Sequence, residues 1–174
     1  AINPELDGHL QRVHDEDRYD AWSKGQTGWP FFDACMRSLT ATGWINFRMR
    51  AMLQSVASYT LWLPWQETGM HLARHFLDYE PGIHISQLQM QAGVTGFNAL
   101  RVYSPTKQFL DQDPDAKFVK RWVPELTTVD PKKFHAPLED KHPLAASYPA
   151  PIIDHGEERK QTLEVFKKHR SQQK

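Results

Sequence analysis

Two arginines, Arg48 and Arg50, lie inside the most strongly apolar segment of the chain. In a helix over residues 44–63 each residue advances by about 100°, so the two side chains are roughly 160° apart and at least one must point inward. A buried charge that loses its partner costs on the order of 3 to 5 kcal/mol, so an acid or an anionic ligand is needed beside it. The nearest acids downstream are Asp78 and Glu80. Two interpretations stay open: a structural ion pair, and a clamp for a cofactor.

Two other candidates for chemistry are weaker. His71 and His75 stand four residues apart, which places both imidazoles on one helix face. No Glu lies between them to act as a base and no further ligands are apparent, so we expect solvated surface residues and no metal site. Cys35 has no His near it in sequence, which favours a packed thiol over a nucleophile. Without a P-loop or a Gly-x-Gly-x-x-Gly motif, a nucleotide held in the Rossmann manner is not expected.

The composition is that of one ordinary domain. Among 174 residues, 40% are hydrophobic and 24% charged, which is enough apolar material for a core. Basic and acidic side chains balance at 21 each, so bulk charge gives no attraction to nucleic acid and any DNA contact must be a local patch. The mean hydropathy is -0.64, and no apolar run approaches the roughly 18 residues of a membrane span.

The single cysteine and the first residues bear on the origin of the chain. Cys35 alone cannot form an internal disulfide or a Cys-rich zinc module, which predicts a reducing, cytoplasmic environment. Because the sequence begins with Ala-Ile-Asn-Pro rather than Met, we expect a processed chain or part of a longer polypeptide. Eight of the 12 prolines lie at or beyond Pro105; we interpret this as a change of composition within a single domain over residues 1–174.

The periodicity of apolar residues predicts an all-α protein with long Pro-rich loops in its second part. Turns are expected at Pro81–Gly82 and Thr95–Gly96. The segment 44–63 is apolar on both sides, which is typical of a buried helix, whereas the last helix is polar enough to lie on the surface. The expected helices cover residues 15–24, 31–42, 44–63, 69–79, 87–92, 115–122 and 157–170.

Several ordered motifs resemble one known family. The string WSKGQTGWPFFDACMR at 22–37, followed by Thr-Gly-Trp at 42–44 and by Arg48 and Arg50, resembles the C-terminal FAD-binding domain of the cryptochrome and DNA photolyase family. The matching motifs are spread over nearly the whole chain from Trp22 onward. The further matching motifs are QAGVTG at 91–96, RVYSP at 101–105, FVKRWVPEL at 118–126 and YPAP at 148–151.

The resemblance implies a helical domain that wraps a bent FAD and that normally follows an α/β antenna domain, which is absent from this chain. It places Arg50 beside the flavin ring with Asp78 as its carboxylate partner, Glu80 near the pyrimidine edge, and His84 close to the position that faces flavin N5. A cation there stabilises negative charge on the reduced ring. Phe47 belongs to the same cofactor site and replaces an Asn that contacts the lesion in the family.

By the same resemblance, Arg48 and Arg101 approach the DNA backbone and supply local phosphate contacts. Repair enzymes of the family flip a pyrimidine dimer out of the duplex toward FAD, and the excited reduced flavin donates an electron that splits it. Two further positions depart from the family pattern: Ala51 stands where a lesion-facing Met is expected, and Gln91 replaces a stacking Trp. These departures weigh against recognition of a pyrimidine dimer.

The chain of tryptophans that carries electrons to the flavin in many relatives is incomplete. Trp65 matches its middle member, but Leu88 or Gln89 replaces the proximal one and Arg12 falls at the distal one. Three functions therefore stay open: light-driven repair of pyrimidine dimers, a blue-light photoreceptor that signals through a protein partner, and a flavin-free helical scaffold. In the first two the missing antenna region, or a partner chain, is expected to complete the protein.

Overall fold

A computed structural model describes residues 2–95, 101–134, 142–153 and 155–172. Within these ranges every regular element is a helix, so the all-α prediction is confirmed. The α-helices are α1 (Pro4–Leu10), α2 (Glu16–Lys24), α3 (Pro30–Thr42), α4 (Phe47–Ser55), α5 (Trp65–His75), α6 (Pro81–Gln91), α7 (Pro105–Gln112), α8 (Lys117–Trp122) and α9 (His155–Gln172). A π-helical turn, η1 (Val56–Thr60), continues α4, and the short 3₁₀ helices η2 (Pro124–Leu126) and η3 (Pro131–Phe134) follow α8.

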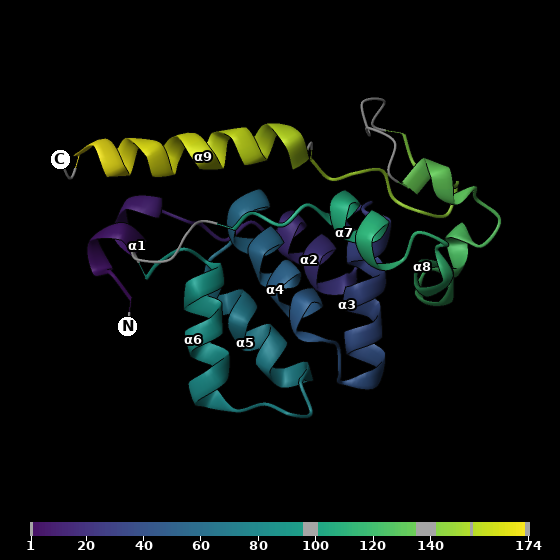
Figure 1. The fold of residues 1–174 in the computed structure, drawn as a ribbon, viewed down its shortest axis with the longest axis horizontal. Helices are drawn as coiled ribbons and strands as arrows, with labels where there is room; N and C mark the ends of the chain where they lie inside the picture. Colours follow the sequence, from purple (N-terminus) through teal and green to yellow (C-terminus); the bar gives the residue numbers. More distant parts are fainter. Residues whose placement is uncertain (1, 96–100, 135–141, 154, 173–174) are drawn as a thin grey trace.

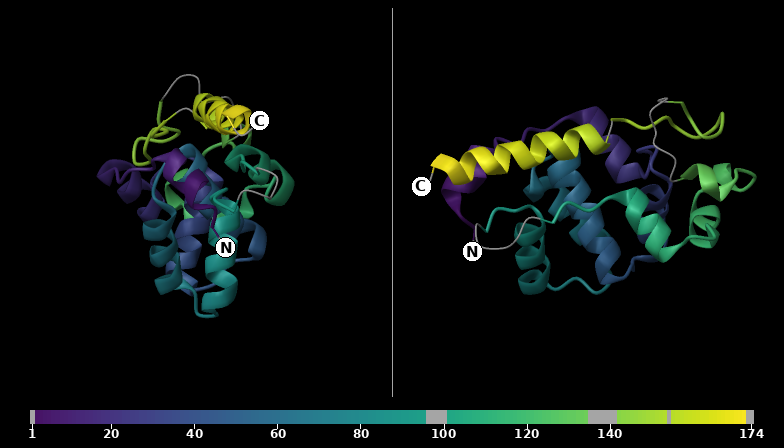
Figure 2. Two further views of the ribbon diagram at one scale, coloured as in Figure 1. Left: turned by 90° about the vertical axis from the view of Figure 1, so that its left-hand side faces the viewer. Right: turned by 45° about the horizontal axis from the view of Figure 1, so that its top comes forward.

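Helix α3 lies near the middle of the arrangement and contacts α2, α4, α7 and α8 (Figure 1). Helices α5 and α6 pack against each other and against α4 at one side of the molecule. The long helix α9 crosses the opposite side and rests on η1 and α1 (Figure 2). No helix in the described ranges combines the length and the apolarity that a bilayer crossing requires.

The first two predicted helices are confirmed, and their ends have simple causes. Asp15 caps α2 by accepting a hydrogen bond from the backbone N–H of Arg18. Gly25 and Gly43 end α2 and α3 in the left-handed conformation, with φ of 61° and 71°, which glycine adopts without steric penalty. Pro30 is the first residue of α3, where its missing N–H is not needed.

The predicted helix over 44–63 is wrong at both ends. It begins at Phe47 because the Asn46 side chain caps it, which leaves Trp44 outside the helix and exposed. Beyond Ser55 the chain widens into the π turn, and Trp62, at φ 56°, ends the helix before Pro64. Side chains from elsewhere satisfy the carbonyl groups near this end: Arg12 donates to Ser58, Arg18 to Leu61 and Thr162 to Tyr59.

The next two predictions also need correction. Helix α5 starts at Trp65, directly after Pro64, and ends at His75 rather than Tyr79. Pro81–Gly82 is not a turn between helices, because Glu80 caps α6 and Pro81 is its first residue. The predicted helix over 87–92 is therefore the last part of an 11-residue helix. Gly96 of the other expected turn lies outside the described residues.

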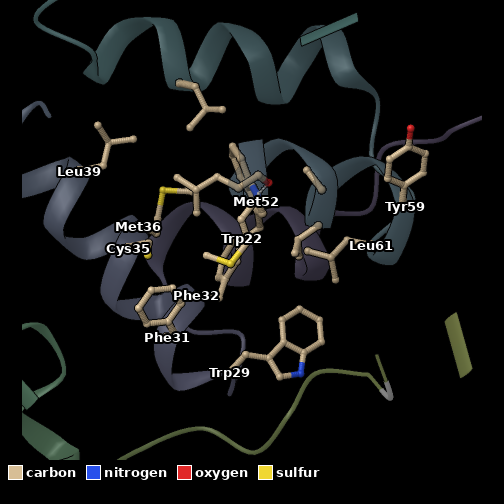
Figure 3. Close-up of a cluster of buried hydrophobic side chains, with 14 of the residues drawn as sticks. Trp22, Trp29, Phe31, Phe32, Cys35, Met36, Leu39, Met52, Tyr59 and Leu61 are labelled. Atoms are coloured by element: carbon tan, nitrogen blue, oxygen red, sulfur yellow. Dashed lines mark hydrogen bonds between the residues drawn. The ribbon is translucent and has the colours of Figure 1, made fainter. Parts of the chain in front are cut away.

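The core gathers around α2, α3 and α4. Figure 3 shows its large side chains, among them Trp22, Phe32, Met36 and Met52, which are all fully buried. Cys35 is buried with them and forms no disulfide, and burial raises the pKa of its thiol well above the ordinary value. The Pro-rich second part contributes to the same core through the buried side chains Phe109, Val119, Leu126 and Phe134.

A buried carboxylate joins the loop that leads to α9 to the turn before α3. Asp33 accepts hydrogen bonds from Thr27 N (2.9 Å), Thr27 Oγ1 (2.7 Å), Gly28 N (3.1 Å) and the Tyr148 hydroxyl. We call these four residues the Asp33 cluster. Burial raises the pKa of Asp33 to about 6, although the hydrogen bonds act in the opposite direction.

Candidate functional site

A cavity of about 180 Å³ lies among α4, α5, α6 and the loop between α5 and α6. Its walls are mostly apolar, with a few polar side chains among them, as is usual for a ligand site. The volume is below the roughly 300 Å³ at the lower end of ordinary ligand pockets. The lining residues are Phe47, Arg50, Ala51, Gln54, Leu72, Phe76, Asp78, Tyr79, Glu80, Ile83, His84, Gln87, Leu88 and Gln91.

The structure brings all five predicted cofactor residues to this one cavity. Phe47 and Arg50 reach it from the first turns of α4, Asp78 and Glu80 from the loop before α6, and His84 from the first turns of α6. Phe47 is exposed, which leaves an aromatic face open to solvent at the rim. Residues that are 37 positions apart in sequence therefore form one site.

Arg50 is held on three sides. Its Nη2 donates to both carboxylate oxygens of Asp78 at 2.9 and 2.8 Å, and its Nε donates to the carbonyl of Ile45 at 2.8 Å. The guanidinium lies over the Phe76 ring, 4.2 Å from the centroid, as in a cation–π contact. Nη1 is the nitrogen left without a hydrogen-bond partner among the described residues, so it is free to bind a ligand acceptor.

The Arg50–Asp78 pair is less buried than the sequence suggested. The side chains are 25% and 51% exposed, so the pair stands at the mouth of the cavity rather than inside the core. The reason is the late start of α4, which places Arg50 in the first turns of the helix, next to solvent. Hydrogen bonding to Arg50 lowers the pKa of Asp78, so this carboxyl group is ionised at neutral pH.

His84 is oriented by a backbone contact. Its Nε2 lies 2.8 Å from the carbonyl oxygen of Gly69, and because a carbonyl only accepts, Nε2 carries the hydrogen. In the neutral ring Nδ1 is then an acceptor. Burial lowers the pKa of His84, which favours that neutral form. The rings of Phe76 and Tyr79 contact His84 edge-on and keep the imidazole in place.

Glu80 has a structural task in addition to any contact with a ligand. Its Oε2 accepts a hydrogen bond of 2.6 Å from the backbone N–H of Ile83, which caps α6. The carboxylate therefore stands at the positive end of a helix, at the edge of the cavity.

Sequence reasoning singled out Gln91 but missed the other two glutamines of the lining, Gln54 and Gln87. The amide of Gln54 is buried and bonded to Ser58 and Thr68. Gln87 is different, because its Oε1 is buried and accepts no hydrogen bond. The feature of the sequence that could have revealed Gln87 is its spacing from His84 and Gln91. The three residues share one face of a helix only if that helix begins at Pro81.

The remaining predicted residues lie away from the cavity lining. Arg48 and Arg101 are both exposed, as contact with a DNA backbone would require. Trp65 is mostly buried at the start of α5 and donates from Nε1 to Asp7 at 3.2 Å. Arg12, at the position of the distal Trp, donates to the carbonyls of Ser58 and Ala92.

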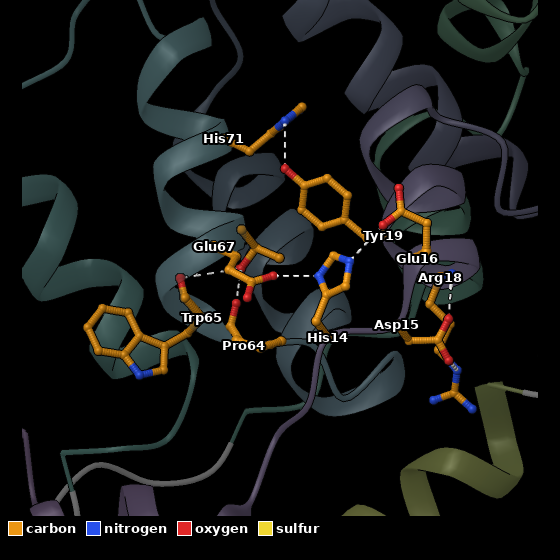
Figure 4. A network of polar contacts seen from close by, with 10 residues as sticks. His14, Asp15, Glu16, Arg18, Tyr19, Pro64, Trp65, Glu67 and His71 are labelled. Carbon is orange, nitrogen blue, oxygen red and sulfur yellow. Dashed lines mark hydrogen bonds and ion pairs between the residues drawn. The ribbon is translucent and has the colours of Figure 1, made fainter.

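The prediction that His71 is a solvated surface residue is wrong, because its ring is half-buried. Within the described ranges no group of three or more metal-binding side chains is found. The Nδ1 of His71 lies 3.3 Å from the Tyr19 hydroxyl, and the Trp22 ring packs edge-on against the imidazole. This burial lowers the pKa of His71 to about 4. Beside it, His14 links Glu16 and Glu67, at 2.9 and 2.7 Å (Figure 4).

The cavity thus offers apolar walls and a guanidinium whose Nη1 has no partner among the described residues. Its lining also includes Gln87, whose buried Oε1 has no partner in the described part of the chain. Such a set suits a flat heterocycle that carries an acceptor or negative charge on one edge and an N–H or O–H donor elsewhere. A flavin has these features, because its ring system is flat, has carbonyl and imine acceptors, and carries one imide N–H. The residues present therefore fit the group.

Comparison with known proteins agrees with this chemistry. Residues 1–168 match the family described as the FAD binding domain of DNA photolyase. The chain is 31% identical over 165 residues to a deoxyribodipyrimidine photo-lyase of Vibrio cholerae, covering 94% of this chain and 35% of that protein. It is 34% identical over 151 residues to the Escherichia coli photo-lyase, with coverage of 84% and 32%.

A cryptochrome DASH of Gloeobacter violaceus is 33% identical over 149 residues, covering 80% of this chain and 30% of that protein. Among solved structures, an archaeal photolyase from Sulfolobus tokodaii with two FAD molecules superposes with a TM-score of 0.83 and 32% identity, over 95% of this chain and 40% of that one. The chain thus spans about a third of the length of the curated relatives it matches.

Proposed function

The chain belongs to the family of FAD binding domains of DNA photolyase, and on this basis we propose that it is the C-terminal part of a flavoprotein that repairs pyrimidine dimers in DNA with light. When bound, FAD supplies the electron for this reaction in its excited reduced form. The chain contributes binding and electrostatics. The proposed activity is that of a lyase acting on damaged DNA.

The observation that carries the proposal is the convergence on one cavity of Phe47, Arg50, Asp78, Glu80 and His84. In this proposal Arg50 stabilises negative charge on the reduced ring, and Asp78 and Phe76 keep the guanidinium in a fixed orientation. A preorganised cation needs no reorganisation when charge develops, which is why its rigid support matters.

The small volume of the cavity supports a divided site. About 180 Å³ is too little for a dinucleotide as large as FAD, so the chain forms one wall and a further region of polypeptide forms the rest. That region is the antenna-containing part of the same protein or a partner chain. The limited coverage of the relatives supports this arrangement.

For DNA, we propose local contacts from Arg48 and Arg101, whose side chains are exposed. Because the formal net charge is zero, binding to the duplex depends on such individual phosphate contacts. Replacing either arginine with alanine should weaken binding of dimer-containing DNA to a similar degree for every sequence context.

FAD titration of the purified protein, with this chain and the region that completes the site both present, is the first test, followed by visible absorption and by blue-light exposure of dimer-containing DNA with reduced FAD. We expect uptake of FAD, loss of uptake in Arg50→Ala, and light-dependent disappearance of dimers. A folded, colourless protein that takes up no FAD would instead identify a flavin-free scaffold.

A blue-light photoreceptor is the second candidate. The observation that favours it is that Ala51 and Gln91, which replace residues that face the lesion in repair enzymes, line the cavity together with Phe47. The similarity to a cryptochrome DASH is compatible with it. Flavin uptake without loss of dimers, accompanied by a light-dependent change in affinity for a protein partner, would select this candidate over repair.

A further inference from the structure

Gln87 occupies the middle of the α6 face that lines the cavity, one turn after His84 and one turn before Gln91. Its Oε1 has almost no contact with solvent and accepts no hydrogen bond from any of the residues that the structure describes. An acceptor in this state has lost its water without gaining a partner, which destabilises the protein unless a ligand provides the missing donor.

Two other glutamines show what distinguishes Gln87. The amide of Gln54, in the same cavity, is satisfied by Ser58 and Thr68, so it has no need of a ligand. Gln108, in α7, also has a buried Oε1 without a partner, but it lies outside the cavity lining. Of these three residues, Gln87 alone combines an unsatisfied acceptor with a place in the cavity lining.

We propose that Gln87 is a specificity-determining residue whose Oε1 accepts a hydrogen bond from an N–H or O–H donor of the bound flavin. The inference rests on the proposed function, since it assigns the ligand to the flavin class. The flavin part of FAD offers two kinds of donor: the N–H groups of the ring, which are the imide N–H and, in the reduced ring, N5–H, and the hydroxyl groups of the ribityl chain. A heterocycle of the same shape that lacks these donors would leave Oε1 unsatisfied and would be rejected.

The test is the substitution Gln87→Met, which keeps the length of the side chain and removes its polar atoms. Two changes of opposite sign are expected. The melting temperature of the flavin-free chain rises by roughly 2 to 4 °C, because the unsatisfied acceptor is gone. The affinity for FAD, measured by quenching of flavin fluorescence, falls about five- to tenfold. Replacing a residue that only packs against its neighbours would not raise the melting temperature and at the same time weaken FAD binding.

Gln108→Met is the matched control. It removes an equally unsatisfied acceptor outside the cavity, so it should raise the melting temperature and leave the FAD affinity unchanged. Gln89→Met, also on α6 but outside the lining, should change neither quantity. Equal FAD affinity in wild type and Gln87→Met would overturn the inference while leaving the proposed function intact.

Two smaller probes identify the donor. Lumiflavin contains the ring alone, and riboflavin adds the ribityl chain. If Gln87→Met weakens the binding of both probes, an N–H of the ring is the donor; if it weakens the binding of riboflavin only, a ribityl hydroxyl is the donor. If neither is weakened, the inference fails. A wild-type protein that contains both this chain and the region completing the site, and that binds none of the three flavins, would contradict both the inference and the proposed function.

Discussion

The Asp33 cluster and the Arg50–Asp78 site are both built around a carboxylate, but they use it in different ways. Asp33 is fully buried and receives four hydrogen bonds from the protein. Asp78 is half-exposed, and the cavity beside it contains a guanidinium nitrogen and an amide oxygen without partners. The comparison teaches that satisfied polar groups hold this fold together, whereas unsatisfied groups on residues that line a cavity mark where a ligand belongs.

The largest expected effect is on the Asp33 cluster. Asp33→Ala leaves Thr27 N, Gly28 N and the Tyr148 hydroxyl buried without an acceptor, and we expect a loss of about 4 kcal/mol in the free energy of unfolding. Urea denaturation measures it. Asp111→Ala, at an exposed position, is the control and should change stability by less than about 0.5 kcal/mol. Similar midpoints for the two variants would contradict the comparison.

Two glycines provide the next test. Gly28 has φ 80°, and a Cβ there would lie 2.5 Å from the backbone N of Pro151, so Gly28→Ala should cost about 3 kcal/mol. At Gly69, in α5 beside the cavity, a Cβ would meet only the end of the Leu88 side chain at 2.2 Å. Because helix propensity offsets part of that crowding, Gly69→Ala should cost about 1 kcal/mol or less. Equal losses in denaturation would show that the cavity wall is as rigid as the Asp33 cluster.

The dependence of stability on pH separates Asp33 from His71. The raised pKa of Asp33, about 6, means that its stabilising contribution is present at low pH and lost as the pH rises through 6. The pKa of His71 is lowered to about 4, so the unfolded chain binds the proton more tightly and the stability falls as the pH drops from about 6.5 to 4.

Between pH 7 and pH 4.5 the wild-type chain should lose about 1 kcal/mol in its free energy of unfolding through His71, a small amount because the ring is partly exposed. In His71→Phe this loss should be absent. Urea midpoints at the two pH values measure it. His142→Gln, at an exposed histidine, should keep the wild-type dependence. An unchanged pH profile in His71→Phe would mean that His71 remains accessible to protons in the folded chain.

The smallest effect on stability is expected at Asp78. Asp78→Asn removes a half-exposed ion pair, which contributes about 1 kcal/mol or less. The same change removes the support of Arg50, so the affinity for FAD should fall about tenfold. Denaturation and flavin titration on the same preparation measure both. A large loss of stability with normal FAD affinity would reverse the roles assigned to the two carboxylates.

Much of the fold was predictable because its signals are local. Asp15 and Gly25 mark the ends of α2, and the apolar spacing of the following segments predicts helices. The helix ends at Phe47 and Pro81 were missed, because capping by Asn46 and Glu80 competes with apolar periodicity and the pattern alone does not show which prevails.

The candidate site was predictable only in part. The need of Arg50 for a counter-charge pointed to Asp78, and both residues line the cavity. The exposure of the pair and the unsatisfied oxygen of Gln87 were not predictable, because both depend on how α4, α5 and α6 pack. The burial of His71 likewise depends on Tyr19 and Trp22, which are about 50 residues away in sequence.

The π turn at Val56–Thr60 has a consequence for comparing this chain with its relatives. A π turn contains about one residue more than an α-helical turn with the same rise along the axis. It therefore resembles a one-residue insertion that leaves the helix unbroken. In a relative with a regular helix here, the alignment gap belongs at this turn rather than in a neighbouring loop. Moving the gap elsewhere would shift Arg50 or Trp65 by one position and rotate its equivalent by about 100° around the helix axis.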